Sequence, residues 1–291
     1  MELAWKRKRR RDGGELRCLE KNGVPFLSFP LLEEYGELVR HGFSTRLGGV
    51  SEGCLSSMNL SFSRGDEKER VLENYRRMAE ALDLPMERMV LSRQTHTTNV
   101  RAVTEEDAGS GIVRPPRYTD VDGLITNVRN IPLVTFYADC IPLYFVDPVH
   151  RAIGLSHSGW RGTVKRMGAA TLRAMEEAYG TRPTEVLACI GPGICGDCYE
   201  VGADVAEKFL EAFGTDGASQ AGRRPILEEK PGGKFQLDLW EANRRVLLEA
   251  GIREEHLAVT DICTCCNQEL LFSHRASGGE RGNLAAFLCL R

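Results

Sequence analysis

The feature that most constrains the fold is a succession of short apolar segments in the middle of the chain, with no helical segment between them. Segments typical of β-strands cover residues 123–126, 132–137, 143–146 and 152–156. Along the whole chain, segments of this type outnumber those with helical periodicity. The pattern predicts an α+β protein with layered mixed β-sheets flanked by helices, and it argues against a doubly wound parallel sheet.

Other segments complete this outline. Apolar residues at helical spacing predict four helices, at 67–83, 162–179, 205–213 and 239–250. Further strands are expected at 89–92, 99–103, 186–190, 257–260 and 284–288. Asn22-Gly23 predicts a hairpin between 16–19 and 25–29. Gly and Pro residues mark 104–119 and 214–233 as surface loops.

Composition narrows the class of protein. The chain has 291 residues, of which 42% are hydrophobic and 27% charged, as in globular proteins, which excludes a disordered chain, a collagen and a coiled coil. No apolar run approaches the ~18 residues that span a bilayer. The N-terminal segment also lacks the apolar stretch of a secretory signal. We therefore expect a cytoplasmic protein without membrane contact, with one catalytic domain over 15–291.

A basic run covers residues 6–11 and stands in a segment, 1–14, that we expect to be a flexible tail. Such a run can bind nucleic acid or act as a nuclear address. A solvated tail is the favoured interpretation, because chain termini are usually poorly ordered. The net charge of the whole chain is −3, so the body is acidic, and nucleic acid is not expected as a partner.

The chain contains ten cysteines and only six histidines. A disulfide framework belongs to short secreted chains, so reduced thiols, some of them metal ligands or reactive, are the better hypothesis. One group is compatible with a structural four-cysteine zinc site: Cys195, Cys198, Cys263, Cys265 and Cys266. Inert buried thiols are the favoured interpretation of this group, and a redox pair of Cys195 and Cys198 is a further alternative.

Metal-competent residues stand at the ends of three predicted strands. His96 ends the segment 92–96, Cys140 lies in 137–142, and His157 lies in 156–162. Two imidazoles and one thiol could bind zinc as an open site, which activates water near neutral pH. Alternatively, each residue is merely packed or hydrogen-bonded, or Cys140 is a nucleophile activated by a histidine. Asp139 could orient a histidine or simply occupy a turn.

Several short motifs together resemble the YfiH family, whose members are also called laccase-domain-containing or polyphenol-oxidase-like proteins. They are QTH at 94–96, ADCIP at 138–142, HSGWRG at 157–162, GPGI at 191–194, YEVG at 199–202, CT at 263–264 and FSHR at 272–275. The resemblance runs from about Gly42 to Arg281. It departs from the family at His274, where an aromatic residue is usual, and at Thr97.

The resemblance has implications for fold, metal and reaction. It implies the layered fold shared with the deamidase domain of cytotoxic necrotising factors. It also implies a zinc site made by His96, Cys140 and His157. The activity implied is phosphorolysis of adenosine, inosine and methylthioadenosine, together with hydrolytic deamination of adenosine. Purine nucleosides and inorganic phosphate are therefore the expected partners; the oligomeric state is left open.

Individual residues are candidates for that chemistry. Arg46 lies in a glycine-bearing loop that matches the family's SxRxGG block, and Arg161 opens a predicted helix, so either could bind phosphate. For both arginines, the alternative is a surface or structural ion pair. Gln94 and Asn59 could hydrogen-bond the base or the ribose. Asp139 is the preferred candidate for the general acid/base.

Four other functions compete with this one. A copper polyphenol oxidase of the multicopper type is disfavoured, because the chain has six histidines and no HxH pair. A hydrolase that uses Cys140 with a histidine, and a protein that binds nucleoside or zinc without turnover, stay open. A deaminase of the nucleobase type is disfavoured, since the chain contains neither HxE nor PCxxC.

Overall fold

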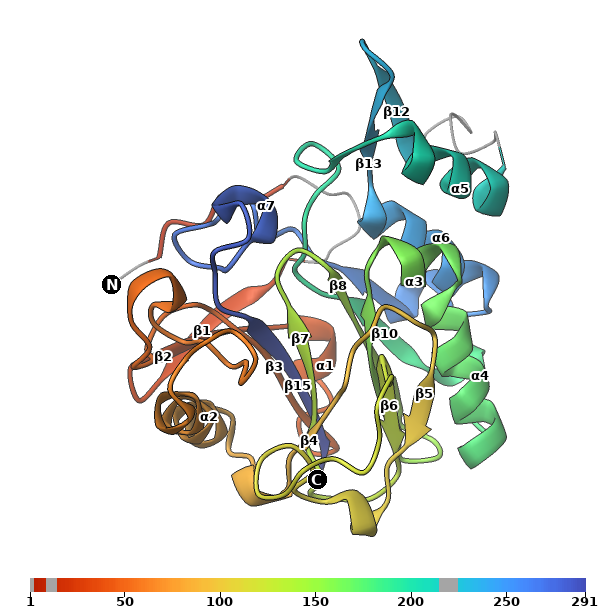
Figure 1. Ribbon diagram of the computed structural model, residues 1–291. Helices are drawn as coiled ribbons and strands as arrows, with labels where there is room; N and C mark the ends of the chain where they lie inside the picture. The colour runs from red at the N-terminus through yellow and green to blue at the C-terminus, as the bar shows by residue number, and fades with distance from the viewer. Residues whose placement is uncertain (1–2, 9–14, 215–224) are drawn as a thin grey trace.

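The computed structural model describes residues 3–8, 15–214 and 225–291, and within these ranges two six-stranded β-sheets lie face to face (Figure 1). The first sheet has the order β1 (Arg17–Lys21), β2 (Val24–Ser28), β3 (Val39–Ser44), β15 (Leu284–Leu290), β7 (Leu133–Tyr137) and β4 (Val90–Leu91). The second has the order β14 (Leu257–Val259), β10 (Leu187–Ile190), β8 (Ile141–Asp147), β9 (Ala152–Ser158), β6 (Gly123–Thr126) and β5 (Val100–Ala102).

Both sheets are mixed. In the first, β4 pairs with β7 in parallel and the other pairs are antiparallel. In the second, β10 with β14 and β5 with β6 are the parallel pairs. A smaller sheet has the order β11 (Glu200–Val201), β13 (Lys234–Leu237) and β12 (Leu227–Lys230). The predicted α+β class with layered mixed sheets and flanking helices is confirmed.

The main core fills the space between the two large sheets, and β15 shows how it is built. Leu284, Ala286 and Leu288 belong to the core between the sheets. Ala285 and Phe287 point the other way, into the apolar layer under α2. Successive side chains of a strand alternate between its two faces, so a strand buried on both sides must be apolar throughout. All seven residues of β15 are buried accordingly.

Helices cover the outer faces of the two sheets, as Figure 1 shows. On the first sheet lies α2 (Lys68–Leu82); on the second lie α3 (Trp160–Val164), α4 (Met167–Tyr179) and α6 (Leu239–Glu249). Short elements complete the fold: α1 (Pro30–Glu33), α5 (Ala203–Phe213), α7 (His274–Ser277) and 3₁₀ turns at Gly53–Leu55, Met86–Arg88, Glu105–Asp107, Pro183–Glu185 and Glu254–His256. No described helix is both long and apolar enough to cross a bilayer.

The structure corrects some of the expected elements. The helix predicted over 162–179 is two helices, because Arg166 adopts a left-handed backbone conformation (φ 61°) between α3 and α4. Strand β3, which contains a histidine and a glycine, and the three polar strands of the small sheet were not predicted. Part of the loop expected over 214–233 forms β12, while 215–224 lies outside the described residues.

Part of the basic N-terminal segment is described, and it lies against the body of the protein. Arg7 forms an isolated bridge with Ile262 and an ion pair of 2.6 Å with Asp261. The backbone N–H of Lys6 donates to the side chain of Asn267. The described residues 3–8 are thus held by the second sheet's end, whereas 9–14 of the expected tail lie outside the described residues.

Buried His41 on β3 makes the stability of the fold depend on pH. Its Nε2 accepts a hydrogen bond of 2.9 Å from the backbone N–H of Phe29, so this nitrogen stays unprotonated. Burial lowers the pKa of His41 to about 4. Below pH 6.5 the unfolded chain binds a proton at His41, whereas the folded protein does not bind it until about pH 4. The free energy of unfolding therefore decreases as the pH is lowered through this window.

We expect His41→Gln to remove this dependence, because glutamine can accept the same hydrogen bond without titrating. Between pH 7 and pH 5, the wild type should lose about 2 kcal/mol more unfolding free energy than the variant. Urea unfolding of chelator-treated protein at both pH values measures the difference. Equal losses in the two proteins would contradict the assignment.

Candidate metal centre

Three metal-competent side chains meet where three strand ends come together. His96 lies in the turn after β4, Cys140 directly precedes β8, and His157 is part of β9. In the antiparallel β8–β9 pair, Pro142 lies opposite His157, which puts Cys140 and His157 at the same end of the pair. The donor atoms all lie within 4.8 Å of one another, and the two imidazole rings meet edge to face with centroids 5.0 Å apart. The structure thus brings the three predicted ligands together.

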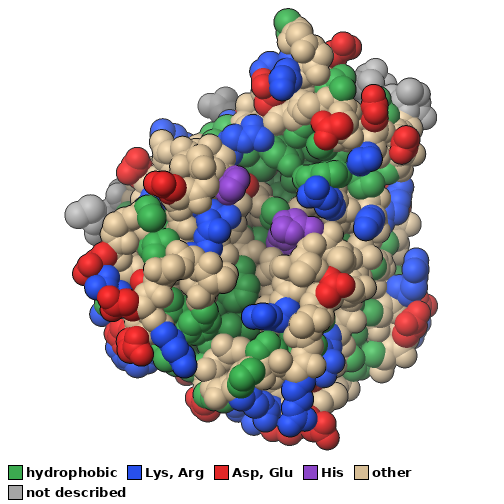
Figure 2. Space-filling view, viewed as in Figure 1, with side chains coloured by type: hydrophobic (Ala, Val, Ile, Leu, Met, Phe, Trp, Pro, Cys, Tyr) green, Lys and Arg blue, Asp and Glu red, His purple; other side chains and the backbone are tan. Residues whose placement is uncertain are grey.

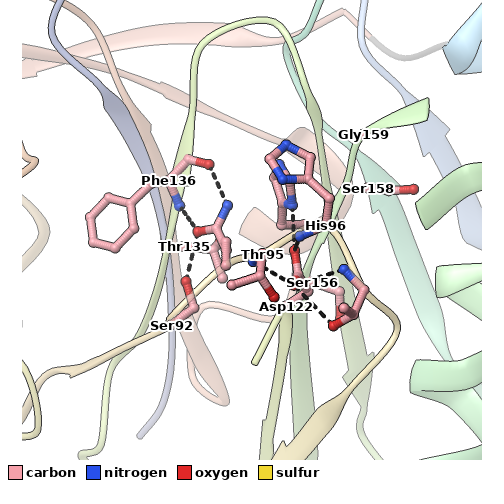
Figure 3. Close-up of polar contacts among 12 residues, drawn as sticks. Ser92, Thr95, His96, Asp122, Thr135, Phe136, Ser156, Ser158 and Gly159 are labelled. Carbon is pink, nitrogen blue, oxygen red and sulfur yellow. Dashed lines mark hydrogen bonds and ion pairs between the residues drawn. The ribbon is translucent and has the colours of Figure 1, made fainter. Parts of the chain in front are cut away.

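A fully buried carboxylate, Asp122 at the start of β6, holds two of these side chains in place. It accepts hydrogen bonds from the backbone N–H groups of Thr95 (2.9 Å), His96 (3.1 Å) and Thr97 (3.0 Å). Nδ1 of His157 lies 2.8 Å from the same carboxylate. Figure 3 shows these bonds converging on Asp122. Because Nδ1 donates to Asp122, Nε2 of His157 is left free for a metal.

The electrostatics of the centre favour a thiolate. Burial by itself raises the pKa of Cys140, but the charges and hydrogen bonds of His157 and His96 outweigh it and bring the pKa to about 6. For His157, burial acts to lower the pKa, but the charges and hydrogen bonds of Cys140 and Asp122 outweigh burial and raise the pKa to about 9. The pKa of Asp122 is raised by burial and lowered by His157 and backbone N–H groups, to about 2. A metal ion that displaces the Nε2 proton of His157 would meet one thiolate and two imidazoles, a donor set that suits zinc.

Gly159 leaves room beside the donor atoms. A Cβ atom added to Gly159 would lie 2.9 Å from Sγ of Cys140 and 3.2 Å from Cδ2 of His96. Both distances are too short for ordinary contacts, so the chain can turn from β9 into α3 this close to the donors only with glycine. The lack of space for a Cβ atom therefore explains why the HSGWRG segment has a glycine at this position.

The three side chains line a cavity of about 930 Å³. Its wall also includes residues 111–116 of the predicted loop 104–119. Apolar and positively charged side chains share the lining: Phe62, Ile112, Phe136, Tyr137, Arg93, Arg114 and Arg281. Figure 2 shows histidine side chains in the middle of this face, with Lys and Arg side chains around them. The cavity can therefore offer one compound both apolar contact and positive charge.

Gln94 also lines the cavity, but protein groups already use its amide. Its oxygen accepts hydrogen bonds from Ser92 Oγ and from the backbone N–H of Phe136, both at 2.7 Å. Its nitrogen donates to the Phe136 carbonyl at 2.8 Å. Gln94 thereby ties the turn of His96 to the end of β7. Contact of Gln94 with a substrate stays a prediction.

Asn59 and Arg46 are not among the residues that line this cavity in the described structure. Asn59 is fully buried and donates to Asp66 and to the carbonyl of Ser61. Arg46 donates to the carbonyls of Ser56 and Gln268, both at 2.9 Å. Both side chains hold loops together here, and their expected contacts with substrate stay predictions.

Arg161 and Asp139 are likewise not among the residues that line the cavity in the described structure. Arg161 is exposed on the five-residue helix α3, with its guanidinium 4.3 Å from the centre of the Trp160 ring. Asp139 directly precedes Cys140, and its carboxylate accepts hydrogen bonds from Thr264 Oγ1 (2.6 Å) and the backbone N–H of Arg275 (2.7 Å). Asp139 thus joins the segment of Cys140 to the C-terminal part of the chain. Catalytic roles for both residues stay predictions.

Two residues of this site, Asp122 and Arg281, were not predicted from the sequence. An acidic residue directly before a buried strand was the available signal for Asp122, whereas nothing distinguished Arg281 from the other arginines. Arg281 lines the cavity, and its buried Nε has no hydrogen-bond partner among the residues that the structure describes. Burial and the positive charge of Arg64 lower the pKa of Arg281 to about 10, so it stays charged at neutral pH.

Known sequences resemble the chain over most of its length. The family described as "Multi-copper polyphenol oxidoreductase laccase" matches residues 40–291. Purine nucleoside phosphorylase YlmD of Bacillus subtilis is 33% identical over 253 residues, which cover 86% of this chain and 88% of that protein. Adenosine deaminase RL5, from an unknown prokaryotic organism, is 33% identical over 243 residues, which cover 82% and 90%.

Known structures resemble it as well. The crystal structure of the hypothetical protein YfiH from Bacillus licheniformis has a TM-score of 0.85 and 31% identity, and the match covers 95% of this chain and 99% of that one. YlmD from Geobacillus stearothermophilus has a TM-score of 0.84 and 33% identity, covering 94% and 98%. The layered mixed-sheet fold is therefore the fold of these proteins.

We expect Gly159→Ala to weaken metal binding about 10- to 100-fold, because the added methyl group displaces Cys140 or His96. Gly162→Ala, three residues further along in α3, is the matched control, since its Cβ would meet no atom closer than 3.6 Å. Competition with a chromophoric chelator measures both affinities. Equal affinities for the two variants would show that the space beside Gly159 is irrelevant to the metal.

Proposed function

The chain belongs to the laccase-like YfiH family, and from this premise we propose that it is a zinc-dependent purine nucleoside phosphorylase that also deaminates adenosine. The proposed substrates are adenosine, inosine and methylthioadenosine. One observation carries the proposal: His96, Cys140 and His157 converge in the wall of a large cavity. The names of the relatives, purine nucleoside phosphorylase and adenosine deaminase, supply the reaction class.

Zinc fits the three donors better than a set of copper ions. The sequence offers six histidines, too few for a multicopper cluster, and only two of them join this centre. Zinc bound by three protein ligands supplies a Lewis acid with a position open to water or substrate. In our proposal Asp122 keeps the proton of His157 on Nδ1, so that Nε2 faces the metal.

The cavity suits a nucleoside in size and lining. Its volume of about 930 Å³ is at the upper end of the usual range for ligand pockets. Phe62, Phe136 and Tyr137 offer aromatic surface against which a purine and a ribose can pack. Polar groups of the turn at 92–96 stand on the same wall as the proposed metal ligands. The base and the reacting carbon can therefore lie near the metal centre.

We place the phosphate beside Arg281. In phosphorolysis a phosphate oxygen forms a bond to the ribose C1′, while the bond from C1′ to the purine breaks and the base leaves with a proton. Arginine binds phosphate oxygens through its planar fork of N–H donors. Arg281 uses Nη1 to donate to Asn283 Oδ1 and to the Gly282 carbonyl, but its buried Nε lacks a protein acceptor among the described residues. Arg46 uses both Nε and Nη1 for carbonyls and does not line the cavity. Arg281 is thus the better candidate.

Product analysis tests the activity. With adenosine and phosphate, the zinc-loaded protein should release adenine and ribose 1-phosphate; without phosphate, it should form only inosine and ammonia. Chromatography separates these products. Formation of neither product by the zinc-loaded wild type would defeat the proposal.

His157→Ala and Cys140→Ala provide the matching controls and should each lose activity together with the zinc of this centre. Chelator treatment of the wild type should do the same, and zinc should restore turnover. Activity that survives metal removal would indicate a hydrolase with Cys140 as its nucleophile. Copper-dependent oxidation of a phenol, without turnover of adenosine, would support the polyphenol oxidase alternative.

We expect Arg281→Ala to raise the KM for phosphate about 10- to 100-fold, since a charged hydrogen bond contributes about 1.5–3 kcal/mol. Deamination needs no phosphate and should change much less. Arg161→Ala is the comparison, because Arg161 is exposed and stacks on Trp160. A raised KM for phosphate in Arg161→Ala, with a normal value in Arg281→Ala, would indicate that phosphate binds at the start of α3 instead.

A further inference from the structure

Four cysteines outside the cavity meet in one place. Cys195 and Cys198 lie in the segment after β10, and Cys263 and Cys266 lie in the segment after β14. Strands β10 and β14 are parallel neighbours, so both segments leave the sheet at the same edge. A bridge between Gly193 and Cys263 continues this pairing. All four sulfur atoms lie within 4.8 Å of one another, with Cys198 and Cys266 at 3.4 Å.

The arrangement has the features of a closed metal site. In a zinc tetrahedron with bonds of about 2.3 Å, the sulfur atoms lie about 3.8 Å apart, close to the spacing found here. The backbone N–H groups of Cys195 and Cys266 point at Sγ of Cys263, at 3.2 and 3.5 Å, where they would stabilise the charge of a metal-bound thiolate. Cys195 and Cys263 are buried, and all four cysteines are free of disulfide bonds.

We propose that Cys195, Cys198, Cys263 and Cys266 bind a second zinc ion, which is structural and separate from the cavity. Four thiolates around one zinc ion leave a net charge of −2, and a positive side chain is near. Lys8 lies close enough for the charges of Cys195 and Cys266 to act on it, and it forms an ion pair of 2.7 Å with Asp197. In this proposal the four cysteines are metal ligands, whereas the sequence alone favoured inert buried thiols.

The proposed ion would join two parts of the chain. It would clamp the segments after β10 and β14 to each other, beneath the N-terminal residues 3–8. Thr264, between two of the ligands, donates to Asp139, and the backbone N–H of Ile194 donates to the Asp139 carbonyl. Since Asp139 precedes Cys140, the second zinc would also support the backbone that carries a ligand of the first centre.

Metal analysis of protein purified under reducing conditions tests this inference independently of any enzymatic activity. We expect two zinc ions per wild-type chain by mass spectrometry of the metals. His157→Ala should retain one, and so should the double variant Cys198→Ser/Cys266→Ser. Cys54→Ser, which changes an exposed cysteine outside the cluster, should retain two and serves as the control.

The zinc content of His157→Ala tests for the second zinc ion even if the double cysteine variant fails to fold. Replacement of its remaining zinc by cobalt should produce intense thiolate-to-cobalt absorption and the strong visible bands of tetrahedral cobalt. A His157→Ala protein without zinc would overturn the proposal. So would iron in place of zinc, or disulfides among the four cysteines in a non-reducing peptide map.

Discussion

The pairing of β9 with β8 and β6 is the interaction on which the candidate centre depends. The register of β8–β9 sets Cys140 beside His157, and the backbone N–H of His157 donates to the carbonyl of Asp122 where β6 begins. A shift of β9 by one residue would turn His157 to the opposite face. All seven residues of β9 are buried, so the apolar core on both faces specifies this register.

The hydrogen bonds of Asp122 show how a charged centre can be stable inside the core. A buried, unpaired carboxylate is costly, and Asp122 is fully buried. Three backbone N–H groups and the imidazole of His157 supply its hydrogen bonds, and each bond to a charged group contributes about 1.5–3 kcal/mol. The same bonds hold the turn in which His96 adopts its left-handed backbone (φ 66°). Binding geometry and local stability therefore rest on one side chain.

The two groups of potential ligands differ in a way that matches their proposed roles. His96 is exposed to the cavity, which leaves the first centre open to a substrate. The four cysteines of the second group provide a complete set of ligands and leave no position for water. Hydrogen bonds from Thr264 and Ile194 to Asp139 connect the two regions.

The sequence by itself determined most elements and singled out the three side chains that meet at the candidate centre. Strand β6 and helices α2 and α6 follow directly from apolar periodicity, which reports local burial. Strand β3 was missed because His41 and Gly42 interrupt its pattern, although tertiary contacts bury both residues. Only the tertiary structure shows that Arg281 lines the cavity, that Arg46 donates to backbone carbonyls and that the four cysteines meet. Periodicity shows which face of an element is buried, whereas long-range pairing decides which side chains meet.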